Sequence, residues 1–443
     1  MLVTLAGGKI VGSEDARDFK QLLVFFCSLL TAHCLPQAKF MIYTGKRILL
    51  GVSGGIAAYK AAELARRLIM AGARVKVAMT AAAREFVAPL TFQALTGEPV
   101  AAAMFGPGAV APLEHVSLGQ EVDAIILAPA TANLIGKLAA GIGDDLLTTI
   151  MLAATSPVLL CPAMNVAMWG SLVVQENLGR LRARGMQVLE PGSGELACGA
   201  VGLGRLPEPE EIVEAGARLL SRQDFSGRRL LVTAGPTHED LDPVRFLSNR
   251  SSGKMGYALA RVAWRRGAQV CLISGPSALA APYGVERVWV RSAWEMLDAV
   301  QERFIGAEAL LMAAAVGDYR PQTLQGLKLK RGKCATQVDL VQNADILREA
   351  GRLKTRQVMV GFAAESHDLE AEALRKLKEK NLDLIVANDV TRSDSGFAVD
   401  TNQVTILRRE GEPLRLPLLS KEEVAERLLD EVAKLLAASG GEG

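Results

Sequence analysis

The segment from residue 47 to residue 79 restricts the possible folds more than any other. Residues 47–52 form an apolar run that ends in Ser53-Gly54-Gly55. Helical periodicity follows over residues 57–71, and a second apolar run covers residues 74–79. A strand, a glycine turn, a helix and another strand in this order predict a parallel sheet covered by helices.

The same alternation continues through the chain and divides it into two halves at the polar joint 224–229. The first half has further expected strands at 124–128, 158–161 and 186–190, and helical segments at 134–154 and 207–221. In the second half we expect strands at 230–234, 269–274, 287–290, 309–313, 358–362, 384–387 and 404–407, and helices starting near residues 252, 293, 344, 369 and 421. The sequence therefore predicts two doubly wound, Rossmann-like, three-layer α/β domains at 41–225 and 226–443.

Composition supports this class of protein and excludes others. The chain has 443 residues, of which half are hydrophobic and 42 are Gly, as in parallel sheets covered by helices on both faces. A net charge of +2 argues against a broad nucleic-acid or membrane surface. The six Cys are scattered without a CxxC pair, which argues against a structural zinc site and for a reducing, cytoplasmic location.

The first 40 residues differ from the rest. Their apolar run at 22–30 is too short to cross a membrane, and the acidic residues before it are unusual for a signal peptide. The regular α/β pattern begins only at Lys46. We therefore expect Met41 to be the natural start and residues 1–40 to be an extension that is disordered or not native.

Polar residues in the first half follow the expected strands. Ligands of open α/β sheets bind at the carboxyl ends of the strands, and glycines there let backbone N–H groups approach a phosphate. The predicted ligand-binding residues are Ser53, Gly54, Thr80, Pro129, Thr131 and Asn133. The alternative to a ligand site is that the glycines only form a tight turn and that the Thr and Asn side chains only cap helices.

Three further residues have the chemistry of a catalytic set. They are an imidazole at His115, a carboxamide at Asn165 and a thiol at Cys198, each in a loop-like segment. A lone Cys in an Ala/Gly loop is more often a small buried residue, and a lone His is often a surface residue. The presence of all three residues together favours a catalytic role for them.

Four motifs of the first half closely resemble the homo-oligomeric flavin-containing cysteine decarboxylases, and among them the phosphopantothenoylcysteine decarboxylases. The motifs are Gly51-Val-Ser-Gly-Gly-Ile-Ala-Ala-Tyr-Lys60, Pro129-Ala-Thr-Ala-Asn133, Pro162-Ala-Met-Asn165 with Met168-Trp169, and Leu196-Ala-Cys198 with Gly202-Leu-Gly-Arg205. The resemblance implies FMN bound by the six residues named above. Met168 and Trp169 are expected to pack rather than react.

The resemblance also implies a mechanism. In this family FMN oxidises the cysteine portion of the substrate to a thioaldehyde, an electron sink that lets CO2 leave, and then returns its electrons. His115 is implied as the base or positioning group at the thiol. Asn165 would bind the substrate carboxylate, and Cys198, on a flap, would donate the proton in the reductive step.

The second half offers an anion site and several cations. Asn249-Arg-Ser-Ser-Gly-Lys-Met-Gly256 precedes a helix without the spacing of a Walker A loop. Ala313 to Pro321 places Asp318 after a strand, where it could bind a metal or a sugar hydroxyl. Lys328-Leu-Lys-Arg331 predicts alternating cations on one strand face, suited to a triphosphate, although such a run is more often solvated.

These segments resemble phosphopantothenate–cysteine ligases, so the resemblance covers residues 46 to about 437. It implies that Lys328 activates the substrate carboxylate on CTP, that Asn249 binds the acyl-cytidylate, and that Asp318 binds Mg²⁺. Two departures from the family pattern, Gly317 in place of Ala and Arg331 in place of Lys, bear on nucleotide affinity. The implied CTP contacts are Ala313, Ala314, Asp318, Lys328, Asn343, Ala344, Asp345, Ile346, Phe362, Lys376 and Lys380.

We therefore predict a bifunctional enzyme of coenzyme A synthesis that uses 4′-phosphopantothenate, cysteine and CTP. The resemblance further implies trimers of the first half and dimers of the second, combined in a dodecamer. Three alternatives stay open: a catalytically silent flavin-fold regulatory protein, an NAD-dependent oxidoreductase, and a flavin decarboxylase acting on peptides. The missing GxGxxG turn disfavours the oxidoreductase. The presence of a ligase-like second half disfavours the decarboxylase acting on peptides.

Overall fold

The computed structural model describes residues 41–443, apart from 106–112, 196–198, 200, 331–336, 366–368, 390–398 and 440–443. The expectation for residues 1–40 lies outside the described residues. So do Cys198 and Arg331.

The first half contains a five-stranded sheet in which every pair is parallel, in the order β2-β1-β3-β4-β5. This doubly wound order reverses between β1 and β3, and such a switch point is where a ligand crevice forms. The strands are β1 (Arg47–Val52), β2 (Arg74–Met79), β3 (Ala124–Ala130), β4 (Val158–Pro162) and β5 (Gln187–Val188).

Helices cover both faces of this sheet because its strands are apolar on both sides. In β1, Leu50 belongs to the core that packs on α2 and α10, and Leu49 belongs to the core that packs on α6, α7 and α9. The segment expected to be mostly helical at 134–154 forms two helices, because Gly141 ends one and Asp145 caps the next. The helices are α2 (Ala58–Met70), α3 (Ala81–Arg84), α4 (Pro89–Thr96), α5 (Glu114–Gln120), α6 (Ala132–Ala140), α7 (Leu146–Ala153), α8 (Val166–Trp169), α9 (Leu172–Ala183) and α10 (Pro209–Leu220).

The second half contains an eight-stranded sheet in the order β12-β11-β8-β13-β16-β17-β19-β20. Its first six strands are parallel and reverse their order between β8 and β13, whereas β19 and β20 run antiparallel and make the sheet mixed. The strands are β8 (Arg229–Ala234), β11 (Gln269–Ser274), β12 (Glu286–Trp289), β13 (Ala309–Met312), β16 (Val358–Glu365), β17 (Leu384–Asp389), β19 (Val404–Arg408) and β20 (Leu414–Arg415).

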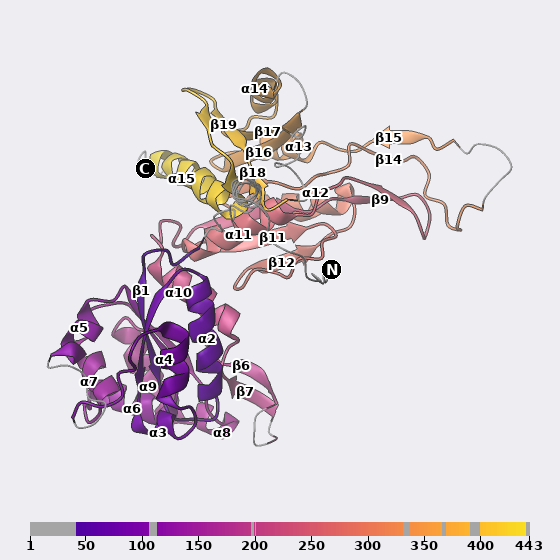
Figure 1. The fold of residues 1–443 in the computed structure, drawn as a ribbon. Coiled ribbons are helices and arrows are strands. Elements are labelled where there is room, and N and C mark those ends of the chain that lie inside the picture. Colours follow the sequence, from indigo (N-terminus) through magenta and orange to yellow (C-terminus); the bar gives the residue numbers. More distant parts are fainter. Residues whose placement is uncertain are drawn as a thin grey trace, which may run out of the picture. The chain divides into compact units, whose positions relative to one another are not determined.

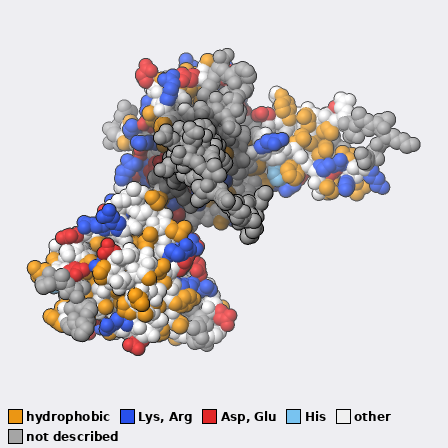
Figure 2. Space-filling view, viewed as in Figure 1, with side chains coloured by type: hydrophobic (Ala, Val, Ile, Leu, Met, Phe, Trp, Pro, Cys, Tyr) orange, Lys and Arg blue, Asp and Glu red, His pale blue; other side chains and the backbone are white. Residues whose placement is uncertain are grey.

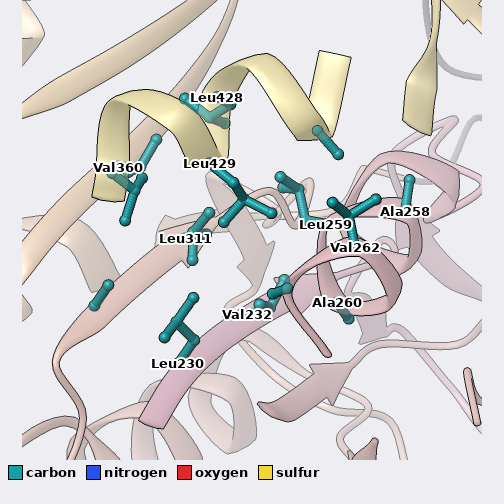
Figure 3. Packing of buried hydrophobic residues seen from close by; sticks show 14 of the residues in the cluster. Leu230, Val232, Ala258, Leu259, Ala260, Val262, Leu311, Val360, Leu428 and Leu429 are labelled. Atoms are coloured by element: carbon teal, nitrogen blue, oxygen red, sulfur yellow. The ribbon is translucent and has the colours of Figure 1, made fainter. Parts of the chain in front are cut away.

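Apolar side chains also fix the helices on this second sheet. Figure 3 shows Leu230 and Val232 of β8 close to Leu259 of α11 and Leu429 of α15. Leu231 of β8 belongs to the core on the opposite face, as the two-residue repeat of a strand requires. The helices are α11 (Lys254–Arg265), α12 (Ala293–Phe304), α13 (Ile346–Leu353), α14 (Leu369–Glu379) and α15 (Lys421–Ser439).

Four short strands form an arm that extends from the second sheet (Figure 1). In it β9 (His238–Asp240) pairs with β10 (Phe246–Ser248), and β14 (Tyr319–Pro321) pairs with β15 (Leu340–Gln342). The prediction of a strand at Lys328 was wrong, because residues 328–330 form a loop within this arm. Among the described residues, none of the helices is long and apolar enough to span a bilayer.

Two further strand pairs are short. In the first half β6 (Gly192–Glu195) and β7 (Val201–Arg205) form an antiparallel hairpin, and the predicted Cys198 lies between them in the sequence. In the second half β18 (Thr401–Asn402) pairs with β21 (Leu419–Ser420).

Candidate functional sites

A pocket of about 1200 Å³ lies at the carboxyl ends of β1, β3 and β4. This is the switch point of the first sheet, where an open α/β sheet places its ligand. The structure brings Asn165 to this pocket together with all six residues predicted to bind the cofactor: Ser53, Gly54, Thr80, Pro129, Thr131 and Asn133.

The Ser53 hydroxyl joins two strand ends beneath the pocket. It donates to the Pro129 carbonyl oxygen at 2.7 Å and accepts from the Thr131 amide at 2.9 Å. Thr131 also caps α6, and Thr80 caps α3. Capping and pocket lining are therefore roles of the same side chains, and the capping fixes them in place.

Gly54 provides room at the helix end of the pocket. A Cβ atom at this position would lie 2.3 Å from the Ala82 Cβ and 2.6 Å from the Ala82 carbonyl carbon, which is too close for any side chain. Backbone without a side chain at a strand-to-helix turn suits the phosphate of a flavin nucleotide. The volume and this turn both fit FMN.

Asn165 lies at the start of α8 and lines the same pocket. Its Oδ1 accepts from the Ala167 amide at 2.8 Å, so the side chain caps this helix. Met164 and Met168 line the pocket beside it, whereas Trp169 is buried in the core. Trp169 thus packs, and Met168 lies at the pocket.

Of the other two predicted catalytic residues of this half, the structure describes only His115. His115 lies on α5, outside the residues that line the pocket. Cys198 falls outside the described residues, although Glu195, Gly204 and Arg205 of the flanking hairpin strands do line the pocket.

Sequence reasoning missed the cations of the pocket. Lys60 of α2, Lys137 of α6 and Arg205 of β7 all line it. Lys60 pairs with Glu208 at 3.0 Å, and Arg205 pairs with the same carboxylate at 3.1 Å. Lys60 and Arg205 belong to the family motifs quoted above, which is the signal that could have indicated their place in the pocket.

In the second half, a loop from residue 313 to residue 318 follows β13 at the switch point of the sheet. The Ala314 amide donates to Thr233 Oγ1 at 3.1 Å, and the Gly317 amide donates to Thr237 Oγ1 at 2.9 Å. Asn249 donates through Nδ2 to the carbonyl oxygens of Ala315 at 3.1 Å and Val316 at 3.0 Å. Asn249 and the predicted nucleotide loop therefore share one site.

The other side of this loop contacts the segment before α13. Asn343 donates through its backbone to the Asp318 carbonyl oxygen and through Nδ2 to that of Gly317, both at 2.8 Å. Asp345 caps α13 and pairs with Lys380 at 2.9 Å. The structure thus brings Asp318, Asn343, Asp345 and Lys380 together.

The remaining residues predicted to contact the nucleotide lie in the apolar cores, on α14 and in the arm. Ala344 and Ile346 pack in the core beside α13, and half-buried Phe362 packs on the opposite face of the sheet. Lys376 lies on α14, and Lys328 is exposed in the arm. Among the described residues, no three His, Cys, Asp or Glu side chains form a group that could hold a metal ion, so Asp318 has no such companions there.

Comparison with known families assigns both halves. Residues 41–221 match the Flavoprotein family, and residues 225–436 match the family described as DNA/pantothenate metabolism flavoprotein C-terminal domain. Together with the pocket at the switch point, these matches define a flavoprotein of pantothenate metabolism.

Full-length relatives narrow the assignment. The chain is 47% identical over 399 residues to the coenzyme A biosynthesis bifunctional protein CoaBC of Bacillus subtilis, covering 89% of this chain and 98% of that protein. It is equally similar to the CoaBC of Escherichia coli K12, with 47% identity over 399 residues, 88% of this chain and 98% of that protein. The chain belongs to the CoaBC family of bifunctional coenzyme A biosynthesis proteins.

Solved structures match one half at a time. The C-terminal domain of a CoaBC protein is 42% identical and covers 49% of this chain and 99% of its own, with a TM-score of 0.43. The FMN-dependent cysteine decarboxylase SpaF is 33% identical and covers 40% of this chain and 97% of its own, with a TM-score of 0.34.

Proposed function

We propose that residues 226–443 ligate cysteine to 4′-phosphopantothenate with CTP and that residues 41–225 decarboxylate the product with FMN. The bifunctional decarboxylase and ligase activity follows from the family. The observation that supports the division is that each half has its own switch-point site: the pocket above Ser53 in one, and the Asn249–Asp318 network in the other.

In the first half, the Ser53–Gly54 turn and the caps at Thr80 and Thr131 would hold the phosphate end of FMN. The bound flavin supplies a reversible two-electron oxidation that makes loss of CO2 feasible. Asn165, in the same pocket, would bind the substrate carboxylate through its amide and so orient the bond that breaks. Cys198 would return a proton to the product.

His115 would serve the pocket of a neighbouring copy, since it does not line the pocket of its own chain. Exposed apolar side chains of this half support such an assembly. Leu113, beside His115, is 72% exposed, and Leu172 and Val173 of α9 are 79% and 64% exposed. Apolar side chains this exposed are typical of surfaces that another subunit covers. We propose a trimer of this half.

The arm supports a second contact, a dimer of the ligase half. Leu324 and Leu327 are 64% and 85% exposed, and Figure 2 shows hydrophobic side chains along the arm. Trimers of one half and dimers of the other would close into a dodecamer.

In the second half, Lys328 would stabilise the charge that builds on the CTP α-phosphate as the carboxylate attacks it and pyrophosphate leaves. Asn249 would hold the acyl-cytidylate while the amine of cysteine displaces CMP. Mg²⁺ would accompany the triphosphate with Asp318 as a protein ligand. The loop 313–318 and Asn343 to Ile346 would surround the cytidine.

The test is an assay of purified protein with 4′-phosphopantothenate, cysteine, Mg²⁺ and either CTP or ATP, in which pyrophosphate and CO2 are both followed. We expect both products with CTP and little pyrophosphate with ATP. Cys198→Ser should abolish CO2 release only, and Lys328→Gln should reduce pyrophosphate release to a small residual rate while leaving decarboxylation of supplied phosphopantothenoylcysteine intact. Folded, yellow protein that forms neither product would refute the proposal.

A further inference from the structure

The turn between β9 and β10 contains a buried carboxylate that the proposed reaction does not use. The Asp242 side chain is 0% exposed. It accepts from the amides of Val244 at 2.8 Å and Arg245 at 2.9 Å, and from Arg245 Nε at 2.9 Å. Because of the Arg245 guanidinium and these amides, the pKa of Asp242 is held well below its usual range.

One further donor connects this carboxylate to a distant part of the chain. The Leu329 amide donates to Asp242 Oδ2 at 3.1 Å, across 87 positions of sequence. Arg245 Nη2 donates to the Leu329 carbonyl oxygen at 2.9 Å. The Asp242–Arg245 pair therefore binds both polar backbone groups of the residue that follows Lys328.

The same turn holds the other end of that segment. The Gln325 amide donates to the Leu241 carbonyl oxygen at 3.1 Å. Residues 325–329 are thus attached to the turn at two points, and Lys328 lies beside the second. Since residues 328–330 form a loop, these bonds rather than a strand ladder fix the backbone at Lys328.

Fixing that backbone matters for a long, flexible cation. An exposed lysine loses rotamer entropy when it binds a phosphate, and a mobile backbone adds to that loss. A group that acts by charge stabilisation is most effective when it is already in place before the reaction.

We propose that Asp242 is a positioning residue for Lys328: through Leu329 and Arg245 it places the lysine where it can stabilise the charge that builds as the substrate carboxylate attacks the nucleotide. This inference rests on the proposed role of Lys328. It extends that role to a residue that does not itself reach the reacting atoms.

The test compares Asp242→Asn, Lys328→Gln and the double variant in the full chain. Asp242→Asn should lower kcat for pyrophosphate release about 10-fold while KM for cysteine stays constant. In the Lys328→Gln background the same change should have no further effect, because it acts through the lysine. Asp240→Asn is the matched control, since Asp240 is in the same arm but pairs with Arg291. It should keep wild-type kcat.

The outcomes separate the two claims. If Lys328→Gln keeps full activity, the role of Lys328 fails and this inference with it. If Lys328→Gln retains only a small residual rate but Asp242→Asn is normal, or if the two effects multiply in the double variant, only the inference fails. Hydrogen exchange of the wild-type protein supplies a measurement that needs no variant: the Gln325 and Leu329 amides should exchange slowly, and exchange as fast as in an unfolded peptide would overturn the proposal.

Discussion

The two candidate sites occupy equivalent places in their sheets but are built differently. The pocket of the first half is centred on residues that follow β1, β3 and β4, and the Ser53 hydroxyl joins two of these strand ends. The site of the second half depends also on residues away from its sheet, including Asn249 and the loop that Asp242 holds. The first site is thus built mainly on strand ends, and the second depends on loops that hydrogen bonds hold in place.

This difference predicts how each site fails. In the first half a single steric change at a strand end should remove the ligand altogether. In the second half the loss of one hydrogen bond should weaken a site that other bonds still hold.

The largest effect is expected at Gly54. Gly54→Val places a side chain where even a Cβ would lie 2.3 Å from the Ala82 Cβ, so FMN should be lost and decarboxylation should fall by at least about 100-fold. Pyrophosphate release should be unchanged. Flavin absorbance measures the bound FMN, and CO2 release measures decarboxylation. Gly55→Ala is the control, because its Cβ would meet only Thr131 Cγ2 at 3.4 Å. A yellow, active Gly54→Val would contradict the steric argument.

A smaller effect is expected at Thr237, which is fully buried. Thr237→Val keeps the shape but removes the acceptor for the Gly317 amide, and an unsatisfied buried amide costs about 1–3 kcal/mol. We expect kcat/KM for CTP to fall about 10-fold while bound flavin is retained. Thr237→Ser, which keeps the hydroxyl, should be close to wild type. Equal activity of the Val and Ser variants would show that this bond does not support the site.

A change in stability of a few degrees is expected at Lys421, the buried first residue of α15. Burial lowers its pKa from 10.5 to about 8, so the unfolded chain binds more protons than the folded one between pH 8 and 10.5. This lysine therefore destabilises the fold below pH 8, and the penalty disappears as pH rises to 10.5.

Thermal unfolding from pH 7 to pH 10.5 tests the sign. Lys421→Met should raise Tm at pH 7 by about 3 °C and by less at pH 10.5. Lys434→Met, on the same helix but 69% exposed, should show no such trend. An equal shift at all pH values would rule out the titration of Lys421 as the cause.

The smallest effect is expected at Arg375 of α14. It pairs with Glu372 and with Glu379, both in solvent. Such pairs contribute about 0–1 kcal/mol, so Arg375→Ala should shift Tm by no more than about 1 °C. A larger shift would mean that this helix face is covered in the assembly.

The sequence predicted the central parallel strands well because most of their residues are buried on both faces and therefore apolar. β1, β2 and β11 have the predicted bounds. The arm strands were missed because each has only three residues and a mostly exposed face. The alternation at Lys328 resembled a strand, but the turn at Asp242 uses the backbone of that segment for other hydrogen bonds.

The sites follow the same division. Ser53, Thr80 and Thr131 could be predicted because their proximity follows from the order of the sheet alone. That Asn249 binds the carbonyl oxygens of Ala315 and Val316 could not, because such contacts depend on loop paths that periodicity does not encode. His115 lies on α5 outside the pocket lining, and we propose that it serves the pocket of a neighbouring copy.

The two edge strands of the eight-stranded sheet bear on how the protein behaves at high concentration. Long, flat, unpaired edge strands let sheets of different molecules join and precipitate. At one edge the last strand, β20, spans only Leu414–Arg415. At the other edge, Arg287 stacks over Trp289 of β12 at 4.2 Å, so a charge covers the exposed ring. Both edges of the eight-stranded sheet are therefore poor templates for the joining of sheets.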